Sequence, residues 1–166
     1  MSDLTKLIAP SFYGVHHDIK AGRHTHYWLK GGRGSTKSSF ISVEIILGMM
    51  QDTAANALVL RKVAVNLKDS VYEQLLWAIE ALGVEHLWKA KLSPLQLSYI
   101  PTGQRILFRG ADEPKKIKST KFRKGYCKYI WYEEADEFAG MQEIRTINQS
   151  LMRGGSSFFV FYSYNP

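Results

Sequence analysis

The chain of 166 residues is 45% hydrophobic and 22% charged, a globular composition that excludes a disordered chain and suffices for about one domain, residues 1–166. Cys127 is its one cysteine, which excludes a disulfide framework. The sequence has no apolar run long enough for a membrane span. Its start has no basic end leading into an apolar core, which excludes a secretory signal. We therefore expect a soluble intracellular protein, and its net charge of +7 favours a polyanionic partner.

The predicted elements alternate between strands and helices. In chain order they are a strand over residues 26–31, a helix over 37–51, a buried strand over 56–62, an amphipathic helix over 67–82, a hairpin over 95–110, a strand over 126–134, a helix over 140–152 and a buried strand over 156–166. Strands separated by helices are joined by right-handed crossovers, so we expect an α/β fold: a mainly parallel sheet flanked by helices, with an inserted β-hairpin. In such sheets ligands bind at the carboxyl ends of the strands.

The stretch "GGRGSTKSS", residues 31–39, lies between the first strand and the first long helix. Its glycines let backbone N–H groups turn toward phosphate oxygens, Lys37 would reach the β- and γ-phosphates, and the hydroxyl of Ser38 would bind Mg²⁺. Thr36 departs from this pattern because it adds a Cβ directly before the lysine, where glycine is usual. The alternative is a glycine-rich turn with a helix N-cap at Ser35 or Thr36. The nucleotide-binding hypothesis assigns phosphate contacts to Gly31, Gly32, Arg33, Gly34, Ser35, Thr36, Lys37, Ser38 and Ser39.

Residues 115–128, "KKIKSTKFRKGYCK", contain seven Lys or Arg and no acid, and the rest of the chain has equal numbers of basic and acidic residues. A cationic segment of this kind predicts contact with a polyanion, because neutralising phosphates releases counterions. Lys118, Lys121 and Arg123 are the candidate DNA-binding residues. The alternative is a solvated loop whose lysines keep the protein soluble.

Acidic residues end the strand in "YIWYEEADEF", residues 129–138. An ATP hydrolase needs an acid beside Mg²⁺ and a group that positions the attacking water. At the end of a strand, adjacent side chains can face different groups, so we assign Glu133 to the metal and Glu134 to the water. The alternative is a solvated acidic loop, which the preceding strand and the earlier glycine loop disfavour.

Three arginines are candidates for stabilising the transferring phosphoryl group. Arg33 lies within the glycine loop and would act in cis, which makes it the strongest catalytic candidate beside Lys37 and Glu134. Arg145 and Arg153 would act on a neighbouring subunit, and the alternative for each is an ordinary surface residue.

Other functions remain open at this point. A helicase-like ATPase or a small kinase would use the same glycine loop, although the paired glutamates favour water as the nucleophile. A nucleic-acid-binding module without enzymatic activity would use the basic segment and show no effect of ATP.

Taken together, these motifs resemble the large terminase subunit of tailed bacteriophages, in the branch that includes defective-prophage-type terminases. The resemblance runs over essentially the whole chain and covers "YWLKGGRGSTKSSF", "LVLRKVAVNLKDSVYEQLLWAI", "TGQRILFRGADEPKKIKS", "IWYEEADEF" and the closing "SYNP". It implies a P-loop NTPase fold of the additional-strand, catalytic-glutamate type. It also implies an ATPase that uses ATP and Mg²⁺ to drive double-stranded DNA into a procapsid, with Glu133 in the paired-glutamate version of this site.

The resemblance further implies partners and a coupling motif. Ser163 and Asn165 of "SYNP" look like the motif that couples hydrolysis to movement, the alternative being a plain strand-to-turn exit. A portal protein, a small terminase subunit and a homo-oligomeric ring are the implied partners, in the cytoplasm of the infected bacterial host. A C-terminal nuclease domain is usual in the family, but a two-metal nuclease needs several carboxylates and none follows Pro166. We therefore expect a single ATPase domain without cutting activity.

Overall fold

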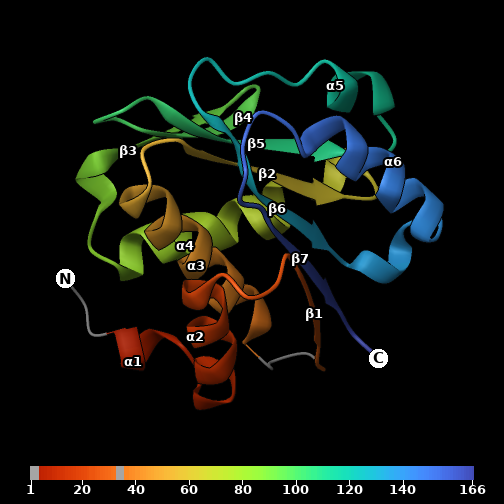
Figure 1. The fold of residues 1–166 in the computed structure, drawn as a ribbon. Coiled ribbons are helices and arrows are strands. Elements are labelled where there is room, and N and C mark those ends of the chain that lie inside the picture. The colour runs from red at the N-terminus through yellow and green to blue at the C-terminus, as the bar shows by residue number, and fades with distance from the viewer. Residues whose placement is uncertain (1–3, 33–35) are drawn as a thin grey trace.

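The computed structural model describes residues 4–32 and 36–166. Within them, seven strands form one sheet in the order β1-β7-β6-β2-β5-β4-β3 (Figure 1). Their bounds are β1 His26–Lys30, β2 Ala55–Arg61, β3 Trp88–Leu92, β4 Leu95–Tyr99, β5 Gln104–Gly110, β6 Tyr126–Glu133 and β7 Phe159–Tyr164. Five strands, β1, β7, β6, β2 and β5, run parallel to one another. β4 runs antiparallel to its two neighbours, β5 and β3. The expected mainly parallel sheet with an inserted hairpin is confirmed.

Helices cover both faces of the sheet. Their bounds are α1 Leu4–Leu7, α2 Tyr13–Ala21, α3 Lys37–Gln51, α4 Glu73–Ala81, α5 Pro114–Lys118 and α6 Met141–Leu151, with a π-helical turn Lys68–Tyr72 directly before α4. One face packs against α2, α3 and α4, and the other against α5 and α6 (Figure 1). In the described part of the chain, none of these helices combines the length and the apolar character needed to cross a bilayer.

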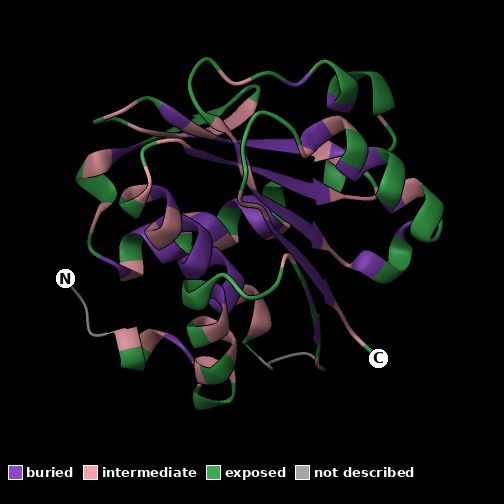
Figure 2. Cartoon of the chain, viewed as in Figure 1, coloured by how far each residue is buried: buried purple, intermediate pink, exposed green. Residues whose placement is uncertain are grey.

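The sheet divides the core into two layers, because successive side chains along a strand point to opposite faces of the sheet. In β6, Tyr129 and Trp131 belong to the core under α3, whereas Ile130 and Tyr132 belong to the core under α6. The first six residues of β2 are buried, as expected for a strand covered on both faces (Figure 2). The long helix α3 is likewise buried around most of its circumference, which explains its nearly uniform apolar sequence.

Several elements were not predicted from the sequence. β3 has one buried residue, Trp88, followed by four exposed ones, so it shows no alternation of apolar and polar positions. In α2 only Ile19 is buried, and α1 has no buried residue, so neither helix has a continuous apolar stripe.

The strand order places two distant segments at the same edge of the sheet. β7 pairs in parallel with β1 on one side and with β6 on the other, so that Leu29, Glu133 and Ser163 stand in register. The carboxyl end of β1, which leads into the glycine loop, and the carboxyl end of β6, which carries the paired acids, are therefore separated by one additional strand.

Candidate active site

Lys37 is the first residue of α3 and lies at the helix end that carries the positive dipole. Its Nζ donates hydrogen bonds to the carbonyl oxygen of Gly31 at 2.9 Å and to Oδ1 of Asn165 at 2.7 Å. The N–H of Gly31 in turn donates to the carbonyl oxygen of Tyr164 at 3.2 Å. The start of the glycine loop, the start of α3 and the end of β7 therefore meet at one ammonium group.

Thr36 has a backbone φ of 65°, in the left-handed region that glycine adopts most readily. For a residue with a Cβ this conformation costs about 1–2 kcal/mol. The carbonyl of Thr36 still accepts a hydrogen bond from the N–H of Phe40 at 3.0 Å, so the first turn of α3 is intact. The departure noted in the sequence thus adds local strain without interrupting the helix.

Glu133 ends β6 and faces α3. Its Oε1 lies 3.5 Å from Oγ of Ser38, and its Oε2 is buried without a hydrogen bond. Burial raises the pKa of Glu133 most, the charge of Glu134 raises it further, and Arg61 and the hydroxyls of Ser70 and Ser38 lower it. Nη1 of Arg61, 3.6 Å from this oxygen, is too far away for a hydrogen bond, and a metal ion bound directly to the carboxylate would remove the cost of the missing partner.

These groups fit a magnesium ion that is bound together with a nucleotide. Mg²⁺ is commonly held by one or two protein oxygens, phosphate oxygens and waters, and Ser38 and Glu133 offer a hydroxyl and a carboxylate side by side. Within residues 4–32 and 36–166, no group of three or more His, Cys, Asp or Glu side chains is placed to hold a metal ion. Phosphate oxygens and waters would therefore complete the coordination.

Glu134 adopts the left-handed conformation with φ of 52° and ψ of 54°. Among the described residues, Thr36 and Glu134 are the two that have positive φ without being glycine, and both belong to the predicted site. Such strain is kept where the surrounding structure enforces it and tends to cluster at functional sites. This supports a special role for Glu134, and its assignment to the attacking water stays a prediction.

Arg61, at the end of β2, is a site residue that sequence reasoning missed. Its Nη1 lies 3.6 Å from Oε2 of Glu133 and its Nη2 lies 3.3 Å from Oε1 of Glu137, while its own side chain is only 12% exposed. Its Nε is buried without a hydrogen bond. The available signal was a charged residue closing the apolar run "ALVL" at the carboxyl edge, where the sheet is expected to bind ligands.

The two predicted coupling residues have different surroundings. Asn165 accepts the hydrogen bond from Lys37 described above. Ser163 is buried, and its hydroxyl accepts a hydrogen bond from Nε1 of Trp131 at 2.9 Å. The structure therefore brings Asn165, rather than Ser163, to the loop lysine.

The remaining candidates are placed as follows. Arg33, Gly34 and Ser35 lie outside the described residues. Gly32 is exposed, and Oγ of Ser39 accepts a hydrogen bond from Nε2 of Gln74 at 3.4 Å. In the described part of the chain, neither Lys37 nor Glu133 forms a hydrogen bond or an ion pair with any of the other candidates, all of them exposed: Arg145, Arg153, Lys118, Lys121 and Arg123.

A cavity of about 540 Å³ opens beside Ser38 and Glu133, between the start of α3 and the segment that leads into α4. Its far wall includes Asp69, Glu73 and Trp77. The volume lies within the range of small-ligand sites, which is roughly 300–1,000 Å³. Space for a ligand is therefore available where the hydroxyl and the carboxylate meet.

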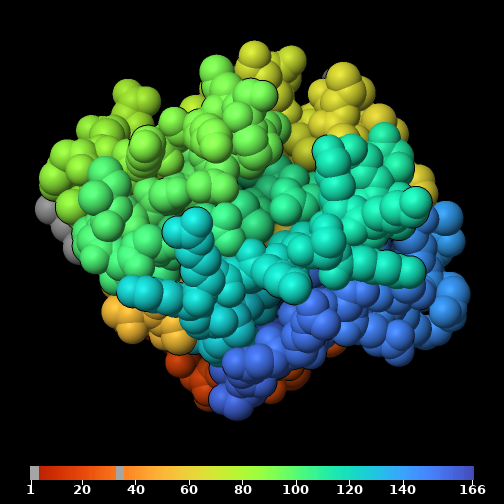
Figure 3. Space-filling model, turned by 90° about the horizontal axis from the view of Figure 1, so that it is seen from above, coloured from red at the N-terminus to blue at the C-terminus, as the bar shows by residue number. Residues whose placement is uncertain are grey.

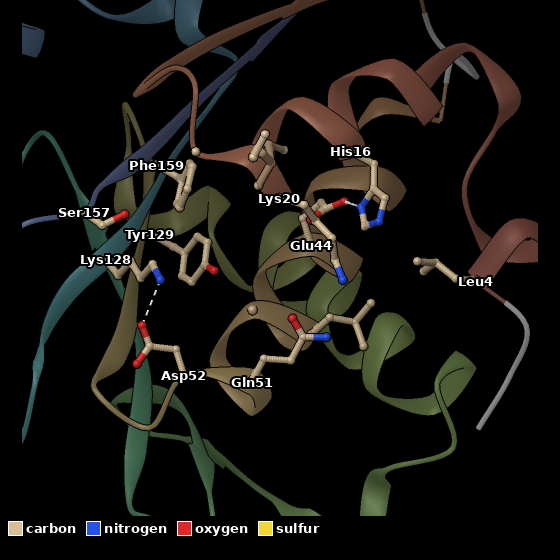
Figure 4. A pocket seen from close by; sticks show the side chains of 15 residues that line it. Leu4, His16, Lys20, Glu44, Gln51, Asp52, Lys128, Tyr129, Ser157 and Phe159 are labelled. Atoms are coloured by element: carbon tan, nitrogen blue, oxygen red, sulfur yellow. Dashed lines mark hydrogen bonds and ion pairs between the residues drawn. The ribbon is translucent and has the colours of Figure 1, made fainter.

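A second cavity, of about 430 Å³, lies near the other end of α3 (Figure 4). It contains the buried Glu44, which pairs with Nδ1 of His16 from α2, and a second ion pair between Lys128 and Asp52 at 2.8 Å. Burial raises the pKa of Glu44 most, and His16 and Lys20 oppose that rise. Of the residues predicted for nucleotide binding, none that the structure describes lines this cavity.

The sequence of this chain is similar to those of known proteins. A family model described as "Phage terminase large subunit" matches residues 23–166. The chain is 45% identical over 167 residues to "Terminase, large subunit" of Bacillus phage SPP1, covering 98% of this chain and 39% of that protein. It is 35% identical over 122 residues to "PBSX phage terminase large subunit" of Bacillus subtilis (strain 168), covering 72% of this chain and 27% of that protein. The chain thus spans less than half the length of either relative.

The fold is shared more widely than the sequence. The solved structure "Crystal Structure of the N-terminal domain of the DNA packaging ATPase from bacteriophage phi29" matches with a TM-score of 0.70 at 12% identity, covering 93% of this chain and 79% of that chain. At this identity the likeness concerns the arrangement of helices and strands.

Proposed function

Since the chain belongs to the phage terminase large subunit family, as its motifs predicted, we propose that it is the ATPase motor part of a DNA-packaging terminase. In this proposal it hydrolyses ATP with Mg²⁺ and uses the energy to move double-stranded DNA into a procapsid. The observation that carries the proposal is the meeting of Lys37, Ser38 and Glu133 at one edge of the sheet, although 95 residues separate the last two in sequence.

Each side chain then has a defined role. Lys37 gives up the carbonyl of Gly31 and the amide of Asn165 to bind phosphate oxygens, while the N-terminal end of α3 favours the same negative charge. Ser38 and Glu133 hold the metal ion, and Mg²⁺ when bound neutralises charge on the phosphates. Gly31, Gly32, Thr36 and Ser39, together with Gly34 and Ser35, surround the phosphates.

Hydrolysis requires a water molecule in line with the phosphorus atom that it attacks. We assign the orientation of that water, and the acceptance of its proton, to the carboxylate of Glu134. Arg33 stabilises negative charge on the transferring phosphoryl group in cis, and Arg145 or Arg153 is the candidate for doing so in a neighbouring subunit. Asn165 senses the phosphate through its contact with Lys37 and passes the change on to the end of β7.

The proposed partners follow from the proposed packaging role. The chain would assemble as a homo-oligomeric ring and act on double-stranded DNA together with a portal protein and a small terminase subunit. It would do so in the cytoplasm of the infected bacterial host.

The proposal is tested by measuring nucleotide binding and phosphate release on the same protein samples. Lys37→Ala should abolish binding of Mg-ATP, because the loop loses its cation. Glu134→Gln should bind Mg-ATP as the parent does but release phosphate roughly 10²- to 10⁴-fold more slowly, the usual contribution of a positioned general base. Lys89→Ala, an exposed lysine on β3, is the matched control and should change neither quantity.

Two results would contradict the assignment. Normal turnover in Glu134→Gln would remove Glu134 from catalysis. Transfer of the phosphoryl group to an added acceptor, without release of free phosphate, would indicate a kinase.

A further inference from the structure

The part of the basic segment from residue 115 to residue 124, called the segment below, lies on the face of the sheet that α5 and α6 cover. The last lysine of the full stretch, Lys128, pairs with Asp52 at 2.8 Å. Within the described part of the chain, Lys116 pairs with Glu113 at 2.8 Å, and this is the ion pair that the segment forms. Its other cations are exposed and have no carboxylate partner among the described residues: Lys115, Lys118, Lys121, Arg123 and Lys124. The segment therefore presents positive charge that the rest of the described chain leaves unbalanced.

Two arginines of β5 hold this segment beside the sheet. Nη2 of Arg105 donates to the carbonyl oxygen of Lys121 at 2.8 Å, and Nε of Arg109 donates to Oγ1 of Thr120 at 3.1 Å. The guanidinium of Arg105 also lies over the ring of Phe122, 5.7 Å from its centroid. Neither arginine has a carboxylate partner among the described residues, and Arg105 adds its charge to this surface.

These cations repel one another in the folded protein. The pKa of Arg105 is lowered by its partial burial and then by the charge of Arg123. The pKa of Arg109 is lowered by burial and then by Arg105, with Glu113 acting in the opposite direction. Concentrating like charges in this way is unfavourable for the isolated chain, and a bound polyanion would relieve the repulsion.

A groove continues this surface toward the end of α6. It has a volume of about 380 Å³ and is lined by Lys121 and Phe122 on one side and by Arg153 and Gly154 on the other. In Figure 3 the segment appears in cyan and meets the blue residues that follow α6. Gly125 closes the segment with φ of 70° against the carbonyl of Ala54, where a Cβ would have no room.

We propose that this surface, the cationic track, binds the phosphate backbone of double-stranded DNA. The track consists of Arg105, Lys115, Lys118, Lys121, Arg123, Lys124 and Arg153. Even fully extended, the chain from Lys118 to Lys124 would span at most about 20 Å, so these residues can reach along no more than about six base pairs of a duplex. This inference rests on the proposed function, and it extends the predicted DNA-binding residues to a surface built from β5, the segment and the turn after α6.

The surroundings favour a duplex over a single strand. Proteins that hold single strands stack bases on free aromatic side chains. Here the ring of Phe122 lies under Arg105, and Tyr126 packs against Phe158 and donates its hydroxyl to the carbonyl oxygen of Ser157 at 2.8 Å. With these rings engaged inside the protein, the exposed groups are cations, which contact phosphates without reading base sequence.

The track is separable from the nucleotide site. Arg105 lies near the amino end of β5 and Lys121 is held beside it, whereas Lys37 and Glu133 lie at the carboxyl edge of the sheet. Substitutions at the Lys121 end should therefore change DNA binding and leave the binding of Mg-ATP unchanged.

The test measures DNA affinity of the full chain at several salt concentrations, with a labelled duplex of arbitrary sequence. The variant is the triple substitution Lys121→Ala, Arg123→Ala and Lys124→Ala, all at exposed positions. The control is the triple substitution Lys6→Ala, Lys89→Ala and Lys91→Ala, which removes the same charge from exposed positions on α1 and β3. Mg-ATP binding is measured on all three proteins.

We expect the slope of log affinity against log salt to decrease by about 0.9 for each phosphate that the variant no longer neutralises, hence by about 2.7 in the track variant. The control should keep the parent slope, and Arg153→Ala alone should lower it by about 0.9. Two results would overturn the proposal that the cationic track binds duplex DNA. They are equal slopes in the track variant and the control, and tighter binding of a single strand than of the duplex. Absence of Mg-ATP binding by the parent would instead refute the proposed function.

Discussion

At the scale of single residues, the pKa of Glu133 is raised by burial, and the charge of Arg61, whose guanidinium lies 3.6 Å from Oε2, opposes that rise. Both side chains are more than four-fifths buried, with 12% and 14% of their surfaces exposed. Removing one member of such a pair leaves a charge without its counter-ion, so we expect Arg61 to act as a positioning residue that opposes the rise in the pKa of Glu133.

A pH profile tests this role. In Arg61→Met the pKa of Glu133 should rise further, since the main opposing charge is gone, and the ionised form that binds Mg²⁺ then exists only at higher pH. The acid side of the pH–rate profile for phosphate release should therefore move to higher pH, while Arg61→Lys, which keeps the charge, should stay closer to the parent. An acid side that coincides in Arg61→Met and in the parent would refute the role.

The sequence predicted some of these residues and not others, for a physical reason. Lys37, Ser38 and Glu133 belong to local motifs in which residue type and spacing indicate chemistry. The contacts of Arg61 with Glu133 and of Asn165 with Lys37 depend on which strands are neighbours, β2 beside β6 and β7 beside β1. Hydrophobic periodicity predicts a strand without specifying its neighbours.

At the scale of elements, α3 runs from Lys37, in the predicted nucleotide site, to the cavity that contains Glu44. Its bounds were predicted from the apolar pattern, and the structure confirms the range 37–51. The pattern did not indicate what Glu44 does in the middle of this buried helix. It pairs with His16 of α2, a helix that the sequence did not predict because little of its surface is buried.

The pH dependence of stability tests the Glu44 contact. The pKa of Glu44 is raised above 4.5 in the folded chain, so the stability linked to it is fully present below pH 4.5 and is lost as the pH rises through the folded pKa. The charged groups that act on it are His16 and Lys20 of α2. Glu44→Gln, which cannot ionise, should therefore have a higher Tm than the parent at neutral pH, and the difference should shrink toward pH 4.5.

Glu80→Gln on α4 is the control for this measurement, since Glu80 is exposed. The difference in Tm between Glu80→Gln and the parent should not increase from pH 4.5 to neutral pH. If Glu44→Gln lowered Tm at neutral pH and not in acid, the ionised carboxylate would be stabilising the contact between α2 and α3, contrary to this account.

At the scale of the whole molecule, one sheet carries two surfaces with different chemistry. The proposed nucleotide site lies at the carboxyl ends of β1, β6 and β2, and the proposed cationic track lies beside β5, on the face that α5 and α6 cover. The alternation of strands and helices predicted the α/β class, and the apolar run over 156–166 predicted the strand β7. The place of β7 between β1 and β6 was expected from the family resemblance alone. The sequence located the basic segment, but the part played by Arg105 and Arg153 depends on folding, because they are distant from it in the chain.

The central claim is that the glycine loop and the acids of β6 form one site for a nucleotide and its metal ion. The most direct test is the affinity for a non-hydrolysable ATP analogue, measured with and without Mg²⁺, in the parent, Lys37→Ala and Glu133→Gln. We predict that Mg²⁺ tightens binding in the parent, that Lys37→Ala loses binding under both conditions, and that Glu133→Gln binds the analogue but gains little from Mg²⁺. A full Mg²⁺ effect in Glu133→Gln would contradict the claim, because the metal would then be held without the acid that ends β6.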